Sequence, residues 1–178
     1  MNDLLADGGK IPILIAPHPM LRAVARPVAS NDDLVRDLAP RMLASMYAAP
    51  GIGLAAPQVG TSLRMFVMDL QENNLRKPLV LINPEILAQS AELSSREEGC
   101  LSIPGQYAEV TRPARVKVRY LDLEGARHEI EGDGLLAACM QHEIDHLNGI
   151  LFVDHISALK RNMLMRRLAK EQRLKKGA

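Results

Sequence analysis

The sequence is poor in cysteine, in aromatic residues and in long apolar runs, and each shortage excludes a class of protein. Its 178 residues include two cysteines, two Phe, three Tyr and no Trp. Two cysteines cannot build a disulfide scaffold or a four-cysteine zinc site, so we expect a reducing, cytoplasmic location. So few aromatic rings leave little for stacking on single-stranded nucleic acid. No apolar run approaches the ~20 residues that cross a bilayer, so we expect no membrane partner.

Neither sign of charge is in excess over the whole chain. Lys and Arg number 22, and Asp and Glu number 21, which gives a net charge of +1. This balance excludes a disordered polyelectrolyte and a protein that is basic throughout. The total nevertheless conceals a strongly basic segment, because residues 160–178 hold eight Lys and Arg against one acid, Glu171.

Residue spacing predicts an α+β fold in one catalytic domain, 1–178, with a body over 1–156 and a basic helix over 157–178. The expected order is one helix, several antiparallel strands and two further helices. The first helix starts at Ser30 to Asp33 and reaches Ala48, and Pro40 should kink or split it. Strands are expected at 64–70, 79–83, 85–93, 114–120 and 128–131. Asp133 should cap a helix over 134–148 that stops at Gly149, and Ser157 should start the last helix.

The strongest chemical signal is an H-E-x-x-H pattern, His142-Glu143-Ile144-Asp145-His146, within the predicted helix 134–148. Residues four apart share a helix face, so both imidazoles can bind one metal ion while Glu143 handles a proton. The alternative is a helix whose solvent face happens to hold two His and two acids. The apolar surroundings favour the metal site, because charged residues rarely occupy such a helix without a partner.

A third ligand would define the kind of metal site. In the longer pattern H-E-x-x-H-x-x-G-x-x-H, the last histidine is replaced here by Phe152, which cannot bind a metal. The acids further along the chain, Asp154 and Glu171, are unattractive, and Glu171 lies within the basic segment. Cysteine is therefore the remaining candidate.

The two cysteines differ in their reach toward a shared ion. Cys139 lies on the helix face of both histidines, but it is ~10 Å from His146 along the helix axis. Bonds of only ~2.0–2.3 Å make it hard for one ion to bind both of these residues together with His142. Cys100 lies in a segment bounded by Gly and Pro that can approach the helix from outside. Either cysteine can instead be a small buried apolar residue, and this is the favoured interpretation for Cys139.

Three separated segments together resemble the peptide deformylase family, in its bacterial form, in their order and approximate spacing. These are 51–58 (GIGLAAPQ), 98–102 (EGCLS) and 141–146 (QHEIDH). The resemblance extends through Asp154, and it implies small antiparallel sheets packed around a central H-E-x-x-H helix. It also implies a metal-dependent hydrolase that removes the formyl group from N-formylmethionyl peptides and releases formate.

The resemblance assigns roles to residues by motif position. The implied metal ligands are Cys100, His142 and His146, with the fourth position left for water. The family typically uses Fe(II) in the cell, and Zn, Ni or Co can replace it. Glu143 would move the proton, while the Gln58 side-chain amide and the Leu101 backbone N–H would stabilise the oxyanion.

Further residues are expected to bind the substrate or to support the helix. We expect Gly53 to let the loop backbone approach the peptide and pair with it like a strand. The other expected substrate-binding residues are Ile52, Leu54, Gly99 and Cys139, with Ile52, Leu54 and Cys139 forming the methionine pocket. The family pattern and the need to pair a charge near the core suggest that Arg112 and Asp145 form an ion pair that holds the motif helix.

The expected partners are N-formylmethionyl peptides and, through the basic segment, the ribosome. The alternative for that segment is a solvated helix face. We expect a monomer. Two rival functions are a metallopeptidase that cuts internal peptide bonds, and a ribosome-associated binding protein with a structural metal. The missing later ligands oppose the first rival, and the retention of Glu143 opposes the second.

Overall fold

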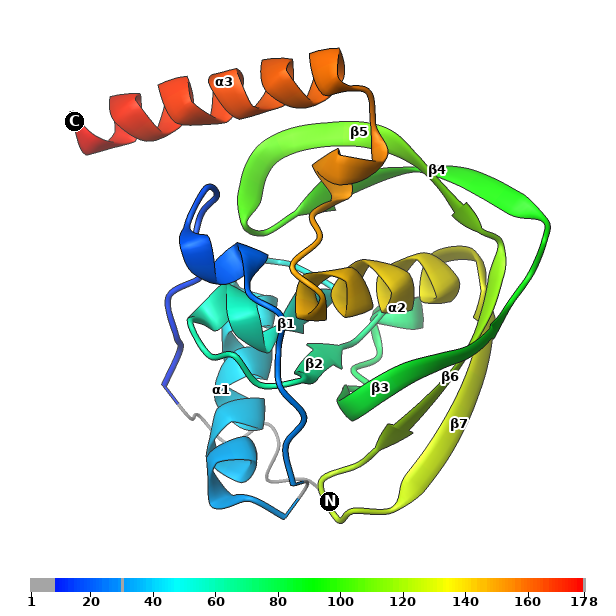
Figure 1. Ribbon diagram of the computed structural model, residues 1–178. Coiled ribbons are helices and arrows are strands. Elements are labelled where there is room, and N and C mark those ends of the chain that lie inside the picture. Colours follow the sequence, from blue (N-terminus) through cyan, green and yellow to red (C-terminus); the bar gives the residue numbers. More distant parts are fainter. Residues whose placement is uncertain (1–8, 30, 178) are drawn as a thin grey trace.

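A computed structural model describes residues 9–29 and 31–177 of the chain (Figure 1). The helices are α1 (Asp33–Ala48), α2 (Gly134–Leu147) and α3 (Ala158–Lys176), with short 3-10 turns η2 (Pro19–Arg22), η3 (Ala56–Val59), η4 (Glu72–Asn74) and η5 (Phe152–His155). The strands are β1 (Gly53–Ala55), β2 (Met65–Met68), β3 (Leu79–Gln89), β4 (Leu93–Cys100), β5 (Ile103–Pro113), β6 (Arg115–Leu121) and β7 (Arg127–Asp133). This content confirms the predicted α+β class.

The strands form two antiparallel sheets on either side of α2 (Figure 1). The larger sheet has the order β1-β2-β3-β6-β7, and β4 and β5 form a separate two-stranded hairpin. Helix α2 contacts β1, β2, β6 and β7, and its apolar residues Ala137, Met140, Ile144 and Leu147 are buried against that sheet. The motif helix is therefore central, as predicted.

Helix α1 forms because apolar residues recur at helical spacing after a capping residue. Val35, Leu38, Met42 and Met46 are buried in one core cluster. The side chain of Asp32 accepts a hydrogen bond from the Leu34 N–H and caps the first turn. Ser30, where the predicted start began, lies outside the described residues. Of the two expected effects of Pro40, a kink or a split, the split was wrong, since α1 continues through this residue.

Helix α2 has the predicted extent, but one of its end signals differs from the prediction. Gly149 has a positive φ of 73° just beyond the helix, and its N–H bonds to the His146 carbonyl, which confirms the expected stop. Asp133 occupies the N-cap position with an extended backbone, but its side chain makes no capping hydrogen bond. The expected capping role of that carboxylate was therefore wrong.

The predicted strand 79–83 and residues 85–89 of the predicted strand 85–93 form one strand, β3, with an irregular register around Pro84, whereas residue 93 begins β4. Asn83 there adopts a positive φ of 49°, and its side chain bonds both backbone groups of Val28. Such an irregularity accommodates a proline that cannot donate to the ladder. The β4–β5 hairpin was not predicted, because the sequence of β4 is Ser-, Glu- and Gly-rich and lacks a strand-forming composition.

Helix α3 lies on the outside of the molecule beside β5 (Figure 1). Ser157 caps it as predicted by accepting from the Lys160 N–H, and Leu164 and Leu168 are buried in a cluster with Ile103. Seven of its eight basic side chains are exposed. Among the described residues, no helix is both long enough and apolar enough to cross a membrane.

Candidate metal centre and active site

Cys100 at the end of β4 meets His142 and His146 on α2. One ligand atom from each residue lies within 4.8 Å of the other two, and the Cys100 Sγ is 3.3 Å from the His146 Nε2. A sulfur and two imidazole nitrogens at this spacing can bind one divalent ion and leave a fourth position open. The structure thus assembles the three residues that the resemblance assigned as ligands.

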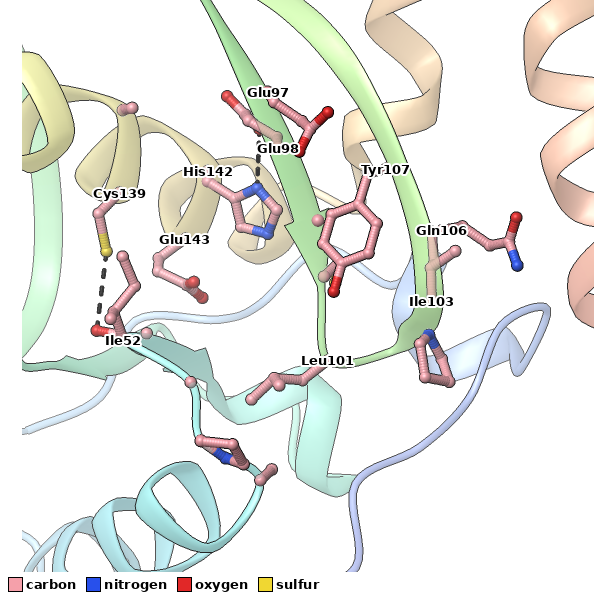
Figure 2. Close-up of a pocket in the computed structure, with 18 of the residues that line it drawn as sticks. Ile52, Glu97, Glu98, Leu101, Ile103, Gln106, Tyr107, Cys139, His142 and Glu143 are labelled. Carbon is pink, nitrogen blue, oxygen red and sulfur yellow. Dashed lines mark hydrogen bonds and ion pairs between the residues drawn. The ribbon is translucent and has the colours of Figure 1, made fainter.

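Cys139 is outside this group. The residue is 5% exposed. Its Sγ points toward the Ile52 carbonyl oxygen, 3.8 Å away, in the wall of the cavity (Figure 2). Burial raises the pKa of the Cys139 thiol well above its ordinary value, so the group remains a neutral thiol at neutral pH. This placement agrees with a pocket wall and not with a metal ligand.

A buried ion-pair network lies behind the histidines. The Arg112 guanidinium donates to both oxygens of Glu98, at 2.5 and 3.0 Å, and to Asp145 at 2.8 Å. Glu98 in turn bonds the His142 Nδ1 at 3.0 Å, which leaves the Nε2 of that ring to face the metal position. The structure therefore contains the expected Arg112–Asp145 contact and adds Glu98 to it.

Glu98 is ionised in this network. Burial alone would raise the pKa of its carboxyl, but hydrogen bonds from His142 and Arg112 outweigh burial and lower the pKa to about 2. A carboxylate on the outer nitrogen of a ligating histidine fixes its tautomer and ring orientation. His155 bonds the same Asp145 at 2.7 Å and so supports the network from outside.

Glu143 points from α2 into the cavity (Figure 2). It is 4% exposed, and its Oε2 is buried without a hydrogen-bond partner among the described residues. Burial raises the pKa of this carboxyl to about 7. A Cβ on Gly53 would lie 2.5 Å from the Glu143 Oε1, so only glycine lets β1 approach this closely. The free oxygen is suited to exchange a proton with a water or substrate atom.

Gln58, in η3, is held with its amide nitrogen toward the site. Its Oε1 accepts the Ala55 N–H at 2.9 Å, and its Nε2 lies 3.1 Å from the Ser102 Oγ and 3.6 Å from the Cys100 Sγ. The side chain is 1% exposed. Leu101 lies between Cys100 and Ser102 in the chain, and its side chain packs over Gly51. The donor side of Gln58 therefore lies next to the metal position.

The site opens into a cavity of about 490 Å³ between β1, the β4–β5 hairpin and α2 (Figure 2). Six of the predicted substrate and oxyanion residues line it, namely Ile52, Gly53, Gln58, Gly99, Leu101 and Cys139. Leu54 does not line it, because its side chain is fully buried in the core beside α1. Any substrate contact of Leu54 is thus limited to its backbone.

Sequence reasoning missed other residues of the cavity and its support. Leu135 forms part of its wall, and Tyr107 reaches over it from β5 (Figure 2). These residues come from a hairpin that was not predicted and from the first turns of α2. Glu98 was within a recognised motif but had no assigned role, because its bond to His142 joins residues 44 positions apart.

Comparisons with known proteins agree with this geometry. Residues 10–162 match the model of the family described as polypeptide deformylase. The chain is 57% identical over 160 residues to a peptide deformylase of Mesorhizobium japonicum, covering 89% of this chain and 91% of that protein. A peptide deformylase of Rhizobium meliloti is 54% identical over 160 residues, covering 89% of this chain and 92% of that protein.

Solved structures give the same result. The crystal structure of a peptide deformylase from Legionella pneumophila matches with a TM-score of 0.89 at 47% identity, covering 94% of this chain and 98% of that one. A peptide deformylase from Synechococcus elongatus, solved in complex with actinonin, matches with a TM-score of 0.84 at 45% identity, covering 88% and 86%. The chain belongs to the peptide deformylase family.

Proposed function

We propose that the cavity beside His142 is the active site in which this chain performs its family's reaction. Peptide deformylases are metal-dependent hydrolases that remove the N-formyl group from N-formylmethionine at the start of nascent polypeptides and release formate. The observation that supports this placement is the convergence of Cys100, His142 and His146 on one point at the bottom of a cavity, with Glu143 beside them.

We assign the metal to Cys100, His142 and His146. The fit is supported by their spacing and by the Glu98 bond that orients His142. The bound ion would lower the pKa of a coordinated water and polarise the formyl oxygen. One thiolate and two imidazoles suit several divalent ions. Following the resemblance, we propose Fe(II) in the cell, with Zn, Ni or Co able to replace it.

Glu143 is proposed to move the proton. As a carboxylate it takes a proton from the water that attacks the formyl carbon, and it then returns that proton to the departing amine. Its unpartnered Oε2 and a pKa raised by burial to about 7 support both steps near neutral pH.

Gln58 and the Leu101 N–H are proposed to stabilise the negative oxygen that forms during attack. The Gln58 Oε1 already accepts a hydrogen bond from the Ala55 N–H. The Gln58 amide nitrogen is therefore oriented as a donor before the substrate binds. A fixed donor of this kind contributes roughly 3–4 kcal/mol to transition-state binding where it has been measured.

The methionine side chain is proposed to enter the part of the cavity walled by Ile52, Leu135, Ala138 and Cys139. The peptide backbone would run along the open edge of β1 and pair with Gly53, as an added strand does. Gly99 lies on the opposite wall, where a Cβ would clash with the Tyr107 ring. Its lack of a side chain keeps that wall open.

We further propose that α3 docks on ribosomal RNA, with the catalytic domain working as a cytoplasmic monomer. Its exposed basic side chains and the single acid Glu171 support this, since a positive helix face binds phosphates. Replacing the exposed Arg166, Arg167, Lys170 and Arg173 by Gln, which keeps the buried Leu168, should weaken ribosome binding in a salt-dependent way and leave cleavage of a short formyl-peptide intact. Unchanged or salt-independent binding would contradict this docking.

The test of the function is product analysis of formyl-Met-Ala-Ser with protein purified anaerobically with iron. The expected products are formate and intact Met-Ala-Ser. Cleavage of an internal peptide bond would support the metallopeptidase alternative. Metal binding without any cleavage would support the binding-protein alternative.

A further inference from the structure

Three acidic residues are buried in the described part of the chain, and two of them, Glu98 and Glu143, belong to the site. The third is Asp69, directly after β2, which is 2% exposed. Its carboxylate accepts hydrogen bonds from the Tyr47 hydroxyl at 2.5 Å and from the N–H groups of Gln71 and Lys77, both at 2.9 Å. It therefore closes residues 69–77 into a loop and attaches this loop to the end of α1.

The same loop also holds the backbone of the cavity wall. The Asp69 N–H donates to the Ile52 carbonyl at 2.9 Å and extends the β1–β2 ladder by one residue beyond the Gly53–Met68 pair. The Gln71 side chain donates to the Gly51 carbonyl at 3.4 Å. Two neighbouring carbonyls of the 51–53 segment are thus fixed by residues that the Asp69 carboxylate orders.

The Asp69–Ile52 bond sets the direction of the next peptide group. In a trans peptide the C=O of Ile52 and the N–H of Gly53 point in opposite directions. Because the carbonyl faces β2, the Gly53 N–H faces the open edge of the sheet, where β1 has no neighbour. Backbone groups alternate along an antiparallel strand, so the Gly53 C=O faces the same edge. That edge borders the cavity.

The Asp69 carboxylate is shielded from solvent on the side of α1, where it contacts Tyr47. The Arg76 guanidinium lies 4.2 Å from the centre of the Tyr47 ring and covers it. Burial and the bond to Asp69 raise the pKa of Tyr47, so this hydroxyl keeps the proton that it donates. The link between α1 and the 69–77 loop is therefore maintained across the neutral range.

We propose that Asp69 is a positioning residue for deformylation. Its carboxylate, held by Tyr47, keeps the 69–77 loop in place, and this loop keeps the Ile52 carbonyl turned toward β2, so that Gly53 presents its backbone groups to the substrate peptide. This inference rests on the proposed function. It predicts an effect on recognition of the peptide that follows the first methionine, with little effect on the formyl chemistry.

The test compares two substrates, formyl-Met-Ala-Ser and N-formylmethionine amide, which lacks the following residues. The variants are Asp69→Asn and Tyr47→Phe. The matched control is Asp122→Asn, because Asp122 similarly accepts the N–H groups of Glu124 and Ala126, in the β6–β7 turn away from the cavity. In both variants, the ratio of kcat/KM for the tripeptide to kcat/KM for the amide should fall about fivefold. The fall should come from a higher KM for the tripeptide. In the control the ratio should stay unchanged.

Hydrogen exchange of the residue 69 amide provides a readout that is independent of activity. Loss of the Tyr47 hydroxyl should speed this exchange on the order of tenfold, while all backbone donors remain in place. If Asp69→Asn fails to fold, Tyr47→Phe decides alone. An unchanged substrate ratio, an equal fall in the control, or unchanged exchange would overturn the inference. Absence of formate release by the wild-type protein would instead count against the proposed function.

Discussion

Arg112→Met should destabilise the protein strongly, because it leaves the buried carboxylate of Glu98 and the partly buried carboxylate of Asp145 without their cation. The Arg112 and Glu98 side chains are each 7% exposed, and that of Asp145 is 18% exposed. Removing one partner of a buried pair costs about 3–5 kcal/mol, in contrast to about 0–1 kcal/mol for an exposed pair. For a chain of this size, that cost corresponds to a fall in Tm on the order of 10 °C.

The assay is thermal unfolding of metal-loaded protein, together with metal content after dialysis against a chelator. Arg115→Met is the matched control, since it removes an arginine from an ion pair with Glu92 whose side chains are 55% and 65% exposed. Arg112→Met should also lose metal about 10–100-fold more readily, because Glu98 then no longer holds His142 firmly. If both variants unfolded at the same temperature and kept metal equally well, the proposed supporting role of Arg112 would be refuted.

Three further predictions concern other parts of the site and the fold. Gly53→Ala should lower kcat/KM on the order of 100-fold, because the new Cβ displaces the Glu143 carboxylate; normal turnover would contradict that close approach. Cys100→Ala should abolish metal retention during dialysis, measured by elemental analysis, whereas Cys139→Ala should keep the metal; equal retention would be inconsistent with the ligand assignment. Burial opposes ionisation of Asp154, but the bond from Arg22 outweighs it and lowers the pKa of this carboxyl. That stabilisation is present above the unfolded pKa of ~3.9 and is lost as pH falls through the folded value, so the Tm deficit of Arg22→Ala should shrink below about pH 4.

Local sequence patterns were sufficient for the helices. The apolar spacing in α1, the stop at Gly149 and the cap at Ser157 are decided within a few residues, and the structure agrees with each. Pro40 does not split α1, because burial of this helix in the core outweighs the loss of one backbone hydrogen bond. Extensive tertiary packing can override the intrinsic helix propensity of a single residue.

The parts that were not predicted depend on contacts between distant segments. The pairing of β4 with β5 and the packing of this hairpin on α2 give Glu98 its bond to His142, and no spacing in the sequence encodes that bond. Helix geometry already disfavoured Cys139 as the third ligand, and the family resemblance then assigned Cys100 to that position. Asp69 was overlooked for the same reason, because two of its partners, Tyr47 on α1 and Ile52 just before β1, are distant in the sequence.

The most direct test of the account compares formate release from formyl-Met-Ala-Ser by the wild-type protein and by Glu143→Gln, each with its metal content measured. The account predicts that both bind one divalent ion and that only the wild type turns over at a normal rate, with the variant slower by ~10²–10⁴-fold. Formate release by a metal-loaded Glu143→Gln protein at the wild-type rate, or none by the metal-loaded wild type, would contradict it.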